Sequence, residues 1–159
     1  MYTFQRMFRS GRFVAEQLSS VTDEQIQPNG VDLTVANVFE QTESGRIDRD
    51  GKSIGERQEL ATSAGAYHLD PGHYIARYGE TISIPEGHIG FVLPRSSLMR
   101  NSAMLHTAVW DAGYTGRGEG LLDVNYELEL QQDARIAQLV LSRAEHVGSY
   151  DGSYQEENL

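Results

Sequence analysis

The stretch Tyr74–Leu93, YIARYGETISIPEGHIGFVL, contains three short strand patterns separated by turn residues. Tyr74–Tyr78 is the first, Thr81–Pro85 alternates between apolar and polar residues up to a Pro-Glu-Gly turn, and Ile89–Leu93 is apolar on both faces. Short strands that follow one another at regular spacing are typical of β-sandwiches, barrels and jelly rolls. The stretch therefore predicts an all-β fold.

The same pattern of strands and turns continues on both sides of this stretch. Towards the N-terminus, Gly30–Val35 is an alternating strand that Val38–Glu40 continues or pairs with, and the polar, glycine-rich Glu43–Arg57 predicts an exposed hairpin or loop. Towards the C-terminus, Leu121–Leu130 predicts a strand pair and Ile136–Leu141 a last buried strand. The chain is thus expected to be mainly β from end to end.

Two short segments favour helix, and the end of the chain favours neither helix nor strand. Phe13–Leu18 is expected to include one helical turn, and the serines of Ser96–Ser102 suit the start of a short helix. Residues after Gly148 are polar and rich in Gly, Ser and Tyr, which is typical of a mobile tail. We therefore expect a β domain over residues 1–148 and a tail over residues 149–159.

The composition excludes several classes of protein. The 159 residues suffice for one domain with a core, and the absence of Cys excludes disulfides, thiolate metal sites and the zinc site of nucleobase deaminases. No apolar run approaches the roughly 18 residues of a membrane span, and the first residues lack the apolar core of a secretory signal. We expect a cytoplasmic protein.

The charge distribution is unusual. The net charge is −10, and of the 13 basic residues only Lys52 is a lysine. An acidic surface poor in lysine is similar to that of proteins from salt-loving microbes. Such a charge disfavours binding to nucleic acid or to anionic membranes, so we expect neither as a partner. Arginines that cluster in the sequence are then expected to act locally, on a small anionic ligand.

Two segments in the second half of the chain suggest chemistry. Pro94–Arg100, PRSSLMR, places two guanidiniums and two hydroxyls within seven residues, a donor set suited to a polyphosphate. Asp111–Gly116, DAGYTG, places a carboxylate three residues before an aromatic ring in a glycine-bounded turn. We call the donors of Pro94–Arg100 the phosphate grip. Together with a carboxylate and an aromatic ring that can stack on a base or sugar, such a set suits the hydrolysis of a nucleotide.

These two segments, with two others, resemble the ordered motifs of the trimeric dUTPase and dCTP deaminase superfamily. Gln27–Leu33 is similar to the first motif, Pro94–Arg100 to the second, Asp111–Gly116 to the third and Arg135–Leu139 to the fourth. The C-terminal tail resembles the deaminase-like branch and lacks the Arg/Gly/Phe-rich fifth motif of ordinary trimeric dUTPases. With the acidic composition, the chain looks like an archaeal, haloarchaeal-like dUTP diphosphatase of that branch.

The resemblance implies a distorted β-barrel or jelly-roll subunit, a homotrimer, and active sites between subunits. It implies cleavage of a deoxyribonucleoside triphosphate between its α and β phosphates, or deamination of dCTP. Tyr114 would lie under the deoxyribose and leave no room for a 2′-hydroxyl. The residues implied to hold the phosphates, acting across the subunit interface, are Arg95, Ser96, Ser97 and Arg100.

The remaining candidates follow from their chemistry, each with a structural alternative. Asp111 suits a general base that orients the attacking water, although an Asp before Ala-Gly also closes turns through its backbone. Asp32 is a candidate to hold Mg²⁺ through water, or else a polar strand residue. Gln138 would bind a phosphate oxygen or neighbouring backbone. Thr107 is a candidate for the wall of the base pocket.

The tail offers Tyr150, Tyr154 and Gln155, which would fold over bound nucleotide and exclude water. The chain departs from the family in ending four residues later, at Glu156–Leu159, EENL. Acidic residues beside a triphosphate are unfavourable without cations, which a salt-rich cytoplasm supplies.

One position separates the two activities of the superfamily. In the deaminases a catalytic Glu follows the third-motif Asp by ten residues, and here that position is Leu121, which cannot transfer protons. Glu119 and Asp123 share its strand parity, so a bulge would be needed to present either of them. The sequence therefore predicts a Mg²⁺-dependent enzyme that converts dUTP to dUMP and diphosphate. A dCTP deaminase, a bifunctional deaminase and diphosphatase, and a non-catalytic nucleotide-binding regulator remain alternatives.

Overall fold

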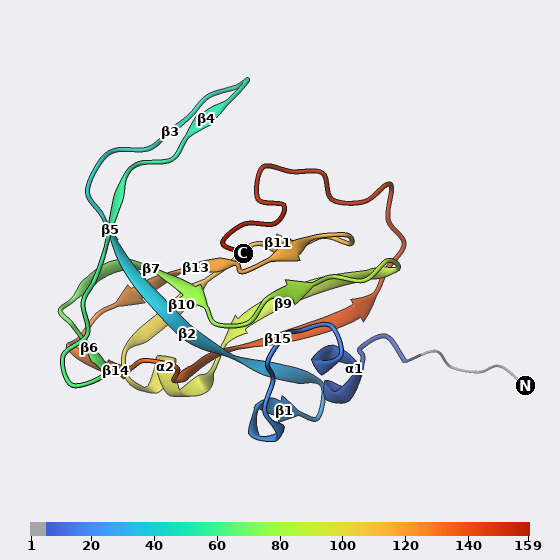
Figure 1. The fold of residues 1–159 in the computed structure, drawn as a ribbon, viewed down its shortest axis with the longest axis horizontal. Helices are drawn as coiled ribbons and strands as arrows, with labels where there is room; N and C mark the ends of the chain where they lie inside the picture. Colours follow the sequence, from blue (N-terminus) through green and yellow to red (C-terminus); the bar gives the residue numbers. More distant parts are fainter. Residues whose placement is uncertain (1–5) are drawn as a thin grey trace, which may run out of the picture.

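The computed structural model describes residues 6–159 and shows a mainly β molecule (Figure 1). Along the chain the elements are α1 (Gly11–Ala15), a 3₁₀ turn (Asp23–Gln25), β1 (Ile26–Gln27), β2 (Gly30–Gln41), β3 (Arg46–Ile47), β4 (Lys52–Ser53), β5 (Arg57–Glu59), β6 (Ala66–Leu69), β7 (Gly72–Tyr78), β8 (Ile82–Ser83), β9 (His88–Pro94), α2 (Ser96–Arg100), β10 (Ala103–His106), β11 (Val109–Trp110), β12 (Thr115–Gly116), β13 (Glu119–Val124), β14 (Leu128–Gln131) and β15 (Arg135–Arg143).

The largest sheet is antiparallel and curls around the core. Its strand order is β10-β13-β7-β2-β15-β9-β11, with β1 and β5 paired to the long strand β2. Three two-stranded sheets join β12 to β8, β14 to β6 and β3 to β4. The all-β prediction with one or two short helices is confirmed, because long-range antiparallel pairing dominates the described chain.

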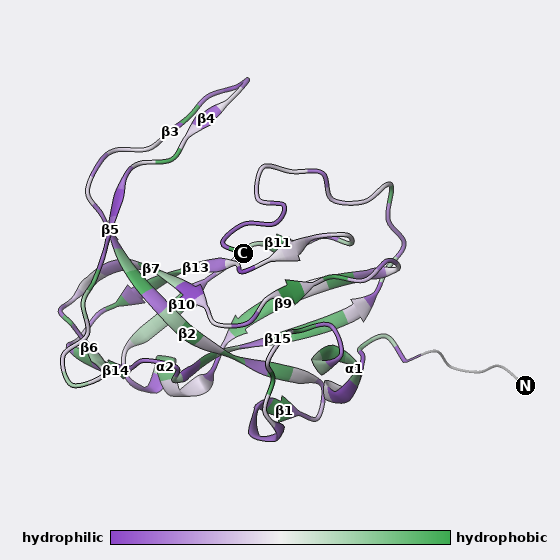
Figure 2. Cartoon of the chain, in the orientation of Figure 1, coloured by the Kyte–Doolittle hydropathy of each residue, from purple (hydrophilic) through white to green (hydrophobic). Residues whose placement is uncertain are grey.

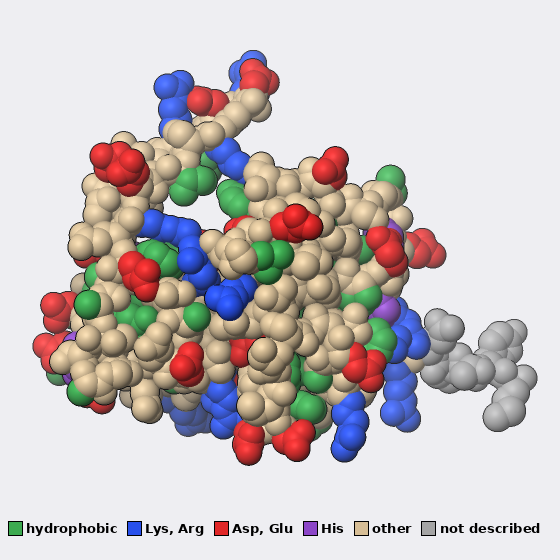
Figure 3. All heavy atoms as spheres, in the orientation of Figure 1, with side chains coloured by type: hydrophobic (Ala, Val, Ile, Leu, Met, Phe, Trp, Pro, Cys, Tyr) green, Lys and Arg blue, Asp and Glu red, His purple; other side chains and the backbone are tan. Residues whose placement is uncertain are grey.

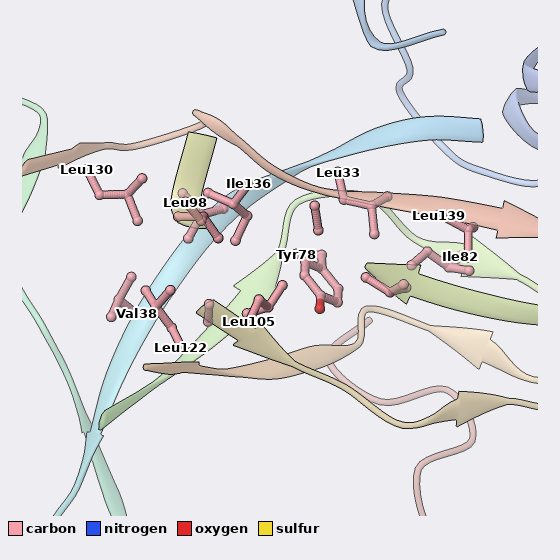
Figure 4. Packing of buried hydrophobic residues seen from close by; sticks show 14 of the residues in the cluster. Leu33, Val38, Tyr78, Ile82, Leu98, Leu105, Leu122, Leu130, Ile136 and Leu139 are labelled. Carbon is pink, nitrogen blue, oxygen red and sulfur yellow. The ribbon is translucent and has the colours of Figure 1, made fainter. Parts of the chain in front are cut away.

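The core is filled from several strands of the curled sheet at once. Leu33 of β2, Leu122 of β13 and Leu139 of β15 are fully buried. In Figure 4, Tyr78 of β7 lies between Leu122 on one side and Leu139 on the other. Figure 2 shows strongly hydrophobic residues along β9 and hydrophilic residues along β5 and much of the tail. The alternation in the sequence thus separates a buried from a solvated face of the sheet.

The ladder between β13 and β7 bears on the choice between the two activities. Its register runs without interruption from Glu119 opposite Arg77 to Val124 opposite Gly72. Alternate residues of β13 are buried, and the outward set includes Leu121, which is 40% exposed. No bulge in this ladder moves a neighbouring carboxylate to the position of Leu121.

A hairpin projects from the body of the molecule, and we call residues 42–56, which include β3 and β4, the arm (Figure 1). Its base is held by the Thr42 N–H and the Glu43 N–H, which both donate to the Glu56 carbonyl oxygen. Most of its side chains are exposed, including Ile47. The prediction of an exposed hairpin or loop here is confirmed.

The two helices lie close to where the sequence placed them. Helix α1 covers Gly11–Ala15 rather than starting at Phe13, because Ser10 is the N-cap and its Oγ accepts a hydrogen bond from the Phe13 N–H at 3.3 Å. Gly11 fits only as glycine, since a Cβ there would overlap the carbonyl oxygen of Gln27. The first residues, which the sequence analysis found to lack the apolar core of a secretory signal, begin outside the described residues. Within residues 6–159, no helix has the length and apolarity to cross a membrane.

We expect Leu139→Ala to lower the free energy of unfolding by about 2–5 kcal/mol, because it removes a fully buried side chain from the centre of the sheet. Ile47→Ala on the exposed arm is the matched control and should change stability by less than about 0.5 kcal/mol. Urea unfolding followed by fluorescence of Trp110 measures both. Equal effects of the two substitutions would contradict this description of the core.

Candidate functional site

A pocket of about 500 Å³ lies between the arm, the turn after β11 and the C-terminal tail. Figure 3 shows the molecule hollowed between the base of the arm and the body, with Lys and Arg side chains along the hollow. Three separate parts of the chain supply the lining, which consists of Ile54, Arg57, Ala108, Val109, Trp110, Asp111, Tyr114, Glu119, Tyr150, Tyr154 and Glu157. Four of the predicted site residues therefore meet here: Asp111, Tyr114, Tyr150 and Tyr154.

Asp111 and Tyr114 are presented by a tight turn between β11 and β12. The Tyr114 N–H donates to the Asp111 carbonyl oxygen at 3.2 Å, and Gly113 between them has a φ of +88°, a conformation that favours glycine. The Asp111 side chain is exposed, whereas Tyr114 is 5% exposed with its ring edge-on to Trp110. The turn thus places a solvated carboxylate beside a fixed aromatic ring.

The tail lies along this turn. The Tyr150 N–H donates to the Ala112 carbonyl oxygen, and the Glu156 N–H donates to the Thr115 carbonyl oxygen, both at 2.7 Å. Gln155 holds the turn with both ends of its amide: Oε1 accepts from the Thr115 N–H and Nε2 donates to the Gly113 carbonyl oxygen, each at 2.9 Å. Residues predicted to form a mobile tail are here packed onto the predicted third motif.

The last contact of the tail involves a carboxylate. The Tyr114 hydroxyl donates to Glu157 Oε1 at 2.9 Å, and the Glu157 carbonyl oxygen accepts from the Arg117 N–H at 3.0 Å. Burial raises the pKa of Glu157, and the nearby charge of Glu119 adds to this effect. The pKa of the Tyr114 hydroxyl is also raised, first by burial and then by its bond to Glu157. Tyr114 is therefore a hydrogen-bond donor here and carries no charge.

Glu119, on the opposite wall, is held by two arginines. Arg57 Nη1 and Nη2 pair with its two carboxylate oxygens at 2.6 and 2.8 Å, and Arg77 Nε is 3.0 Å from Oε1. Both guanidiniums also lie over the ring of Phe39. A carboxylate engaged in this way is poorly suited to shuttling protons.

A separate cluster contains three other predicted site residues: Asp32, Arg95 and Gln138. Asp32 is at its centre and is 1% exposed. Its Oδ2 lies 3.2 Å from Arg95 Nε and 3.3 Å from Arg135 Nη1, and it accepts a hydrogen bond from Gln27 Nε2 at 3.3 Å. Its Oδ1 accepts from Gln138 Nε2 at 3.3 Å. The first, second and fourth predicted motifs thus meet at one buried carboxylate.

This cluster does not fit a protein-held metal. The Asp32 carboxylate is enclosed by four donors, two of them guanidiniums, and within residues 6–159 no three His, Cys, Asp or Glu side chains gather as a metal set. The metal-holding role of Asp32 stays a prediction that this environment does not favour. Its evident role is to fix Arg95 and Arg135.

The other predicted phosphate-binding groups lie away from the pocket. Ser96, Ser97 and Arg100 are exposed on α2, and neither they nor Arg95 line the pocket. Thr107 donates to the Val92 carbonyl oxygen at 2.7 Å and is also absent from the lining. One chain thus presents a pocket with Asp111 and, separately, an exposed set of hydrogen-bond donors that the sequence predicts to bind phosphates.

Sequence reasoning missed three charged residues of the lining as parts of one site: Arg57, Glu119 and Glu157. The sequence suggests Glu119 only as a possible replacement for the catalytic Glu of the deaminases, because it shares strand parity with Leu121. It suggests Glu157 only as a charge that is unfavourable beside a triphosphate. Arg57 begins β5, directly after the arm, and no local pattern predicts that β5 pairs with the end of β2 beside the pocket.

We expect Glu157→Gln to strengthen docking of the tail at neutral pH, because the amide still accepts from Tyr114 but carries no buried charge. Docking raises the pKa of Glu157 above its ordinary value of 4.5, so docking takes up protons. In the parent protein, docking is therefore strongest below pH 4.5 and weakens as the pH rises through the raised value.

Amide hydrogen exchange of Arg117 and Glu156 reports this docking, because both N–H groups bond between tail and turn. Protection should increase in Glu157→Gln. It should change little in Glu156→Gln, whose side chain is exposed. Weaker protection in Glu157→Gln would show that the charge of Glu157 favours docking.

Comparison with known proteins assigns a family to this architecture. Residues 3–144 match the model of the dCTP deaminase-like family. A Halobacterium salinarum protein named a probable deoxyuridine 5'-triphosphate nucleotidohydrolase is 59% identical over an alignment of 157 residues, and the match covers 95% of each chain. A Methanocaldococcus jannaschii protein named a deoxyuridine 5'-triphosphate nucleotidohydrolase is 39% identical, covering 86% of this chain and 90% of its own.

Solved structures share the fold at low sequence identity. A 2'-deoxycytidine 5'-triphosphate deaminase from Agrobacterium tumefaciens matches with a TM-score of 0.69 and 16% identity over 87% of this chain, which spans 48% of that chain. A dUTPase variant of Staphylococcus bacteriophage 80alpha with dUpNHpp matches with a TM-score of 0.51 and 15% identity, covering 86% and 95% of the two chains. The resemblance seen in the motifs is confirmed.

Proposed function

Because the chain belongs to the dCTP deaminase-like family, we propose that it is a dUTP diphosphatase, which hydrolyses dUTP to dUMP and diphosphate. Two observations support this choice within the family: a pocket joins Asp111 and Tyr114, and the unbroken ladder of β13 keeps Leu121 at the position where the deaminases have their catalytic Glu. The names of the curated relatives at 59% and 39% identity agree with it.

Asp111 is the proposed catalytic residue. Its exposed carboxylate orients a water molecule and takes one of its protons as the water oxygen attacks the α-phosphorus. The bond between the α-phosphorus and the oxygen bridging to the β-phosphate breaks, and diphosphate leaves. The edge-packed ring of Tyr114, 5% exposed, has no freedom to move away from the sugar, so it excludes a 2′-hydroxyl.

The phosphate grip of Arg95, Ser96, Ser97 and Arg100 is proposed to serve the pocket of a neighbouring subunit in a homotrimer. Two facts support this: α2 carries exposed donors that do not line its own chain's pocket, and Arg57, the guanidinium in the pocket lining, is already paired with Glu119. The Asp32 cluster anchors Arg95 at the base of this grip and brings Gln138 beside it.

We propose Mg²⁺ as the cofactor, which would neutralise charge on the triphosphate. Asp32 is the residue predicted to hold it through water, although the four donors around its carboxylate do not favour that role. The tail residues Tyr150, Tyr154 and Gln155 are proposed to close the pocket from the side opposite the arm. Thr107 supports the backbone near the proposed nucleobase pocket through its hydrogen bond to the Val92 carbonyl oxygen. A salt-loving source and a cytoplasmic location stay predictions from composition.

Deamination of dCTP is the less favoured reaction. It requires an acid that moves protons between water and the cytosine amino group, and Leu121 occupies that place in an unbroken ladder. The nearest alternative, Glu119, is neutralised by Arg57 and Arg77.

We expect Asp111→Asn to lower kcat for dUTP by about 10²–10⁴-fold, because it removes the proposed base. Binding of dUTP should persist, since the amide keeps the shape of the site. Chromatography of nucleotides and diphosphate after incubation with Mg²⁺ in molar KCl measures turnover. Asp70→Asn, an exposed Asp outside the pocket, is the control and should retain activity.

The same incubation with dCTP separates the alternatives. No ammonia and no deoxyuridine nucleotide should form from dCTP. Uracil products from dCTP would establish a deaminase, and tight binding of dUTP without diphosphate release would establish a non-catalytic binding protein.

A further inference from the structure

The arm is the feature that the proposed function leaves unexplained. It projects from the body with mostly exposed side chains (Figure 1), yet Ile54 near its base lines the pocket, as does Arg57 directly after it. Figure 3 shows the hollow beside this base. An exposed two-stranded hairpin is marginally stable by itself, so its direction depends on contacts it makes elsewhere.

One such contact joins the arm to the tail. The ammonium of Lys52 lies over the ring of Tyr154, with Nζ 4.3 Å from the ring centroid. No hydrogen bond or ion pair links the arm to residues 149–159 within the described chain, so this cation–π contact is the specific link observed there. Lys52 is also the single lysine of the sequence.

Tyr154 lines the pocket, and Lys52 lies two residues before Ile54, which lines it from the arm. Tyr154 belongs to the tail side, with Tyr150 and Glu157, and the strand that carries Lys52 leads directly to Ile54 on the arm side. Holding Lys52 to Tyr154 therefore holds both walls of the pocket together. It also places a positive charge beside an acidic tail in a chain of net charge −10.

We propose that Lys52 is a positioning residue: its ammonium latches the arm onto Tyr154 and keeps the arm and the tail closed over bound dUTP. This inference rests on the proposed function for the identity of the nucleotide, but the latch itself exists in the free protein. A latch outside the reacting groups stabilises substrate and transition state equally, so it lowers KM and leaves kcat unchanged.

The kinetic test uses three variants of Lys52. We expect Lys52→Gln and Lys52→Met to raise KM for dUTP about two- to fivefold without changing kcat, the range for an exposed cation–π contact. Lys52→Arg keeps a cation over the ring and should retain the parent KM. A Tyr154→Leu variant should raise KM similarly, and combining it with Lys52→Gln should add nothing further. Additive effects, or a fall in kcat alone, would overturn the latch.

A structural test needs no turnover. Because the chain has no cysteine, Asp50→Cys on the arm and Ser153→Cys on the tail allow spin labels at two defined sites. Electron–electron dipolar spectroscopy should show one narrow distance in the parent protein, a broad distribution with Lys52→Gln, and a narrow one again with Lys52→Arg.

The two tests separate the possible failures. A distance distribution that Lys52→Gln leaves unchanged, with normal hydrolysis of dUTP, would overturn the latch and leave the proposed function standing. Broadening by Lys52→Gln in a protein that does not hydrolyse dUTP would support the latch and overturn the proposed function.

Discussion

The ring of Tyr114 is the point on which the rest of the site depends. It is anchored in the core by its edge-on contact with Trp110, it follows the glycine turn that presents Asp111, and its hydroxyl receives the tail through Glu157. Tyr150 packs against its other side, with ring centroids 5.6 Å apart. A single buried side chain thus fixes the carboxylate, the floor of the pocket and the docked tail relative to one another.

A second constraint acts through Asp32. Removing a carboxylate from water is costly unless its partners compensate, and here two arginines and two amides do so. The same contacts fix the side chain of Arg95, the residue at the N-cap of α2. The hydroxyls of Ser96 and Ser97 in that helix are exposed. The structure therefore divides the predicted nucleotide-binding groups into two rigid sets, one around Tyr114 and one around Asp32.

Much of the fold could be predicted because it follows from local sequence patterns. Tyr74–Tyr78 follows the period-two pattern, and its residues alternate between buried and less buried. The exposed hairpin was predictable from its polar, glycine-rich composition, and the last buried strand from its apolar run. The pocket was predictable where its residues belong to short motifs, as with Asp111 and Tyr114 in the turn and Tyr150 and Tyr154 in the tail. Arg57 and Glu157 could not be found in this way, because they lie 54 and 46 residues from Asp111 in the sequence. Strand pairing and tail docking bring them to the pocket. Local spacing also could not show that Asp32 is already neutralised by arginines of two other motifs.

The central claim is that the Asp111 pocket of one subunit works with the α2 phosphate grip of another, and a mixing experiment tests it most directly. Asp111→Asn and Arg100→Ala chains, each with its own affinity tag, would be co-expressed and purified through both tags, so that every assembly contains both. The account predicts that each variant alone is nearly inactive and that the mixed assembly regains dUTP hydrolysis, because some sites then combine an intact Asp111 with an intact Arg100. A mixed assembly no more active than its parents would contradict the account, because it would place both groups in a site built from one chain.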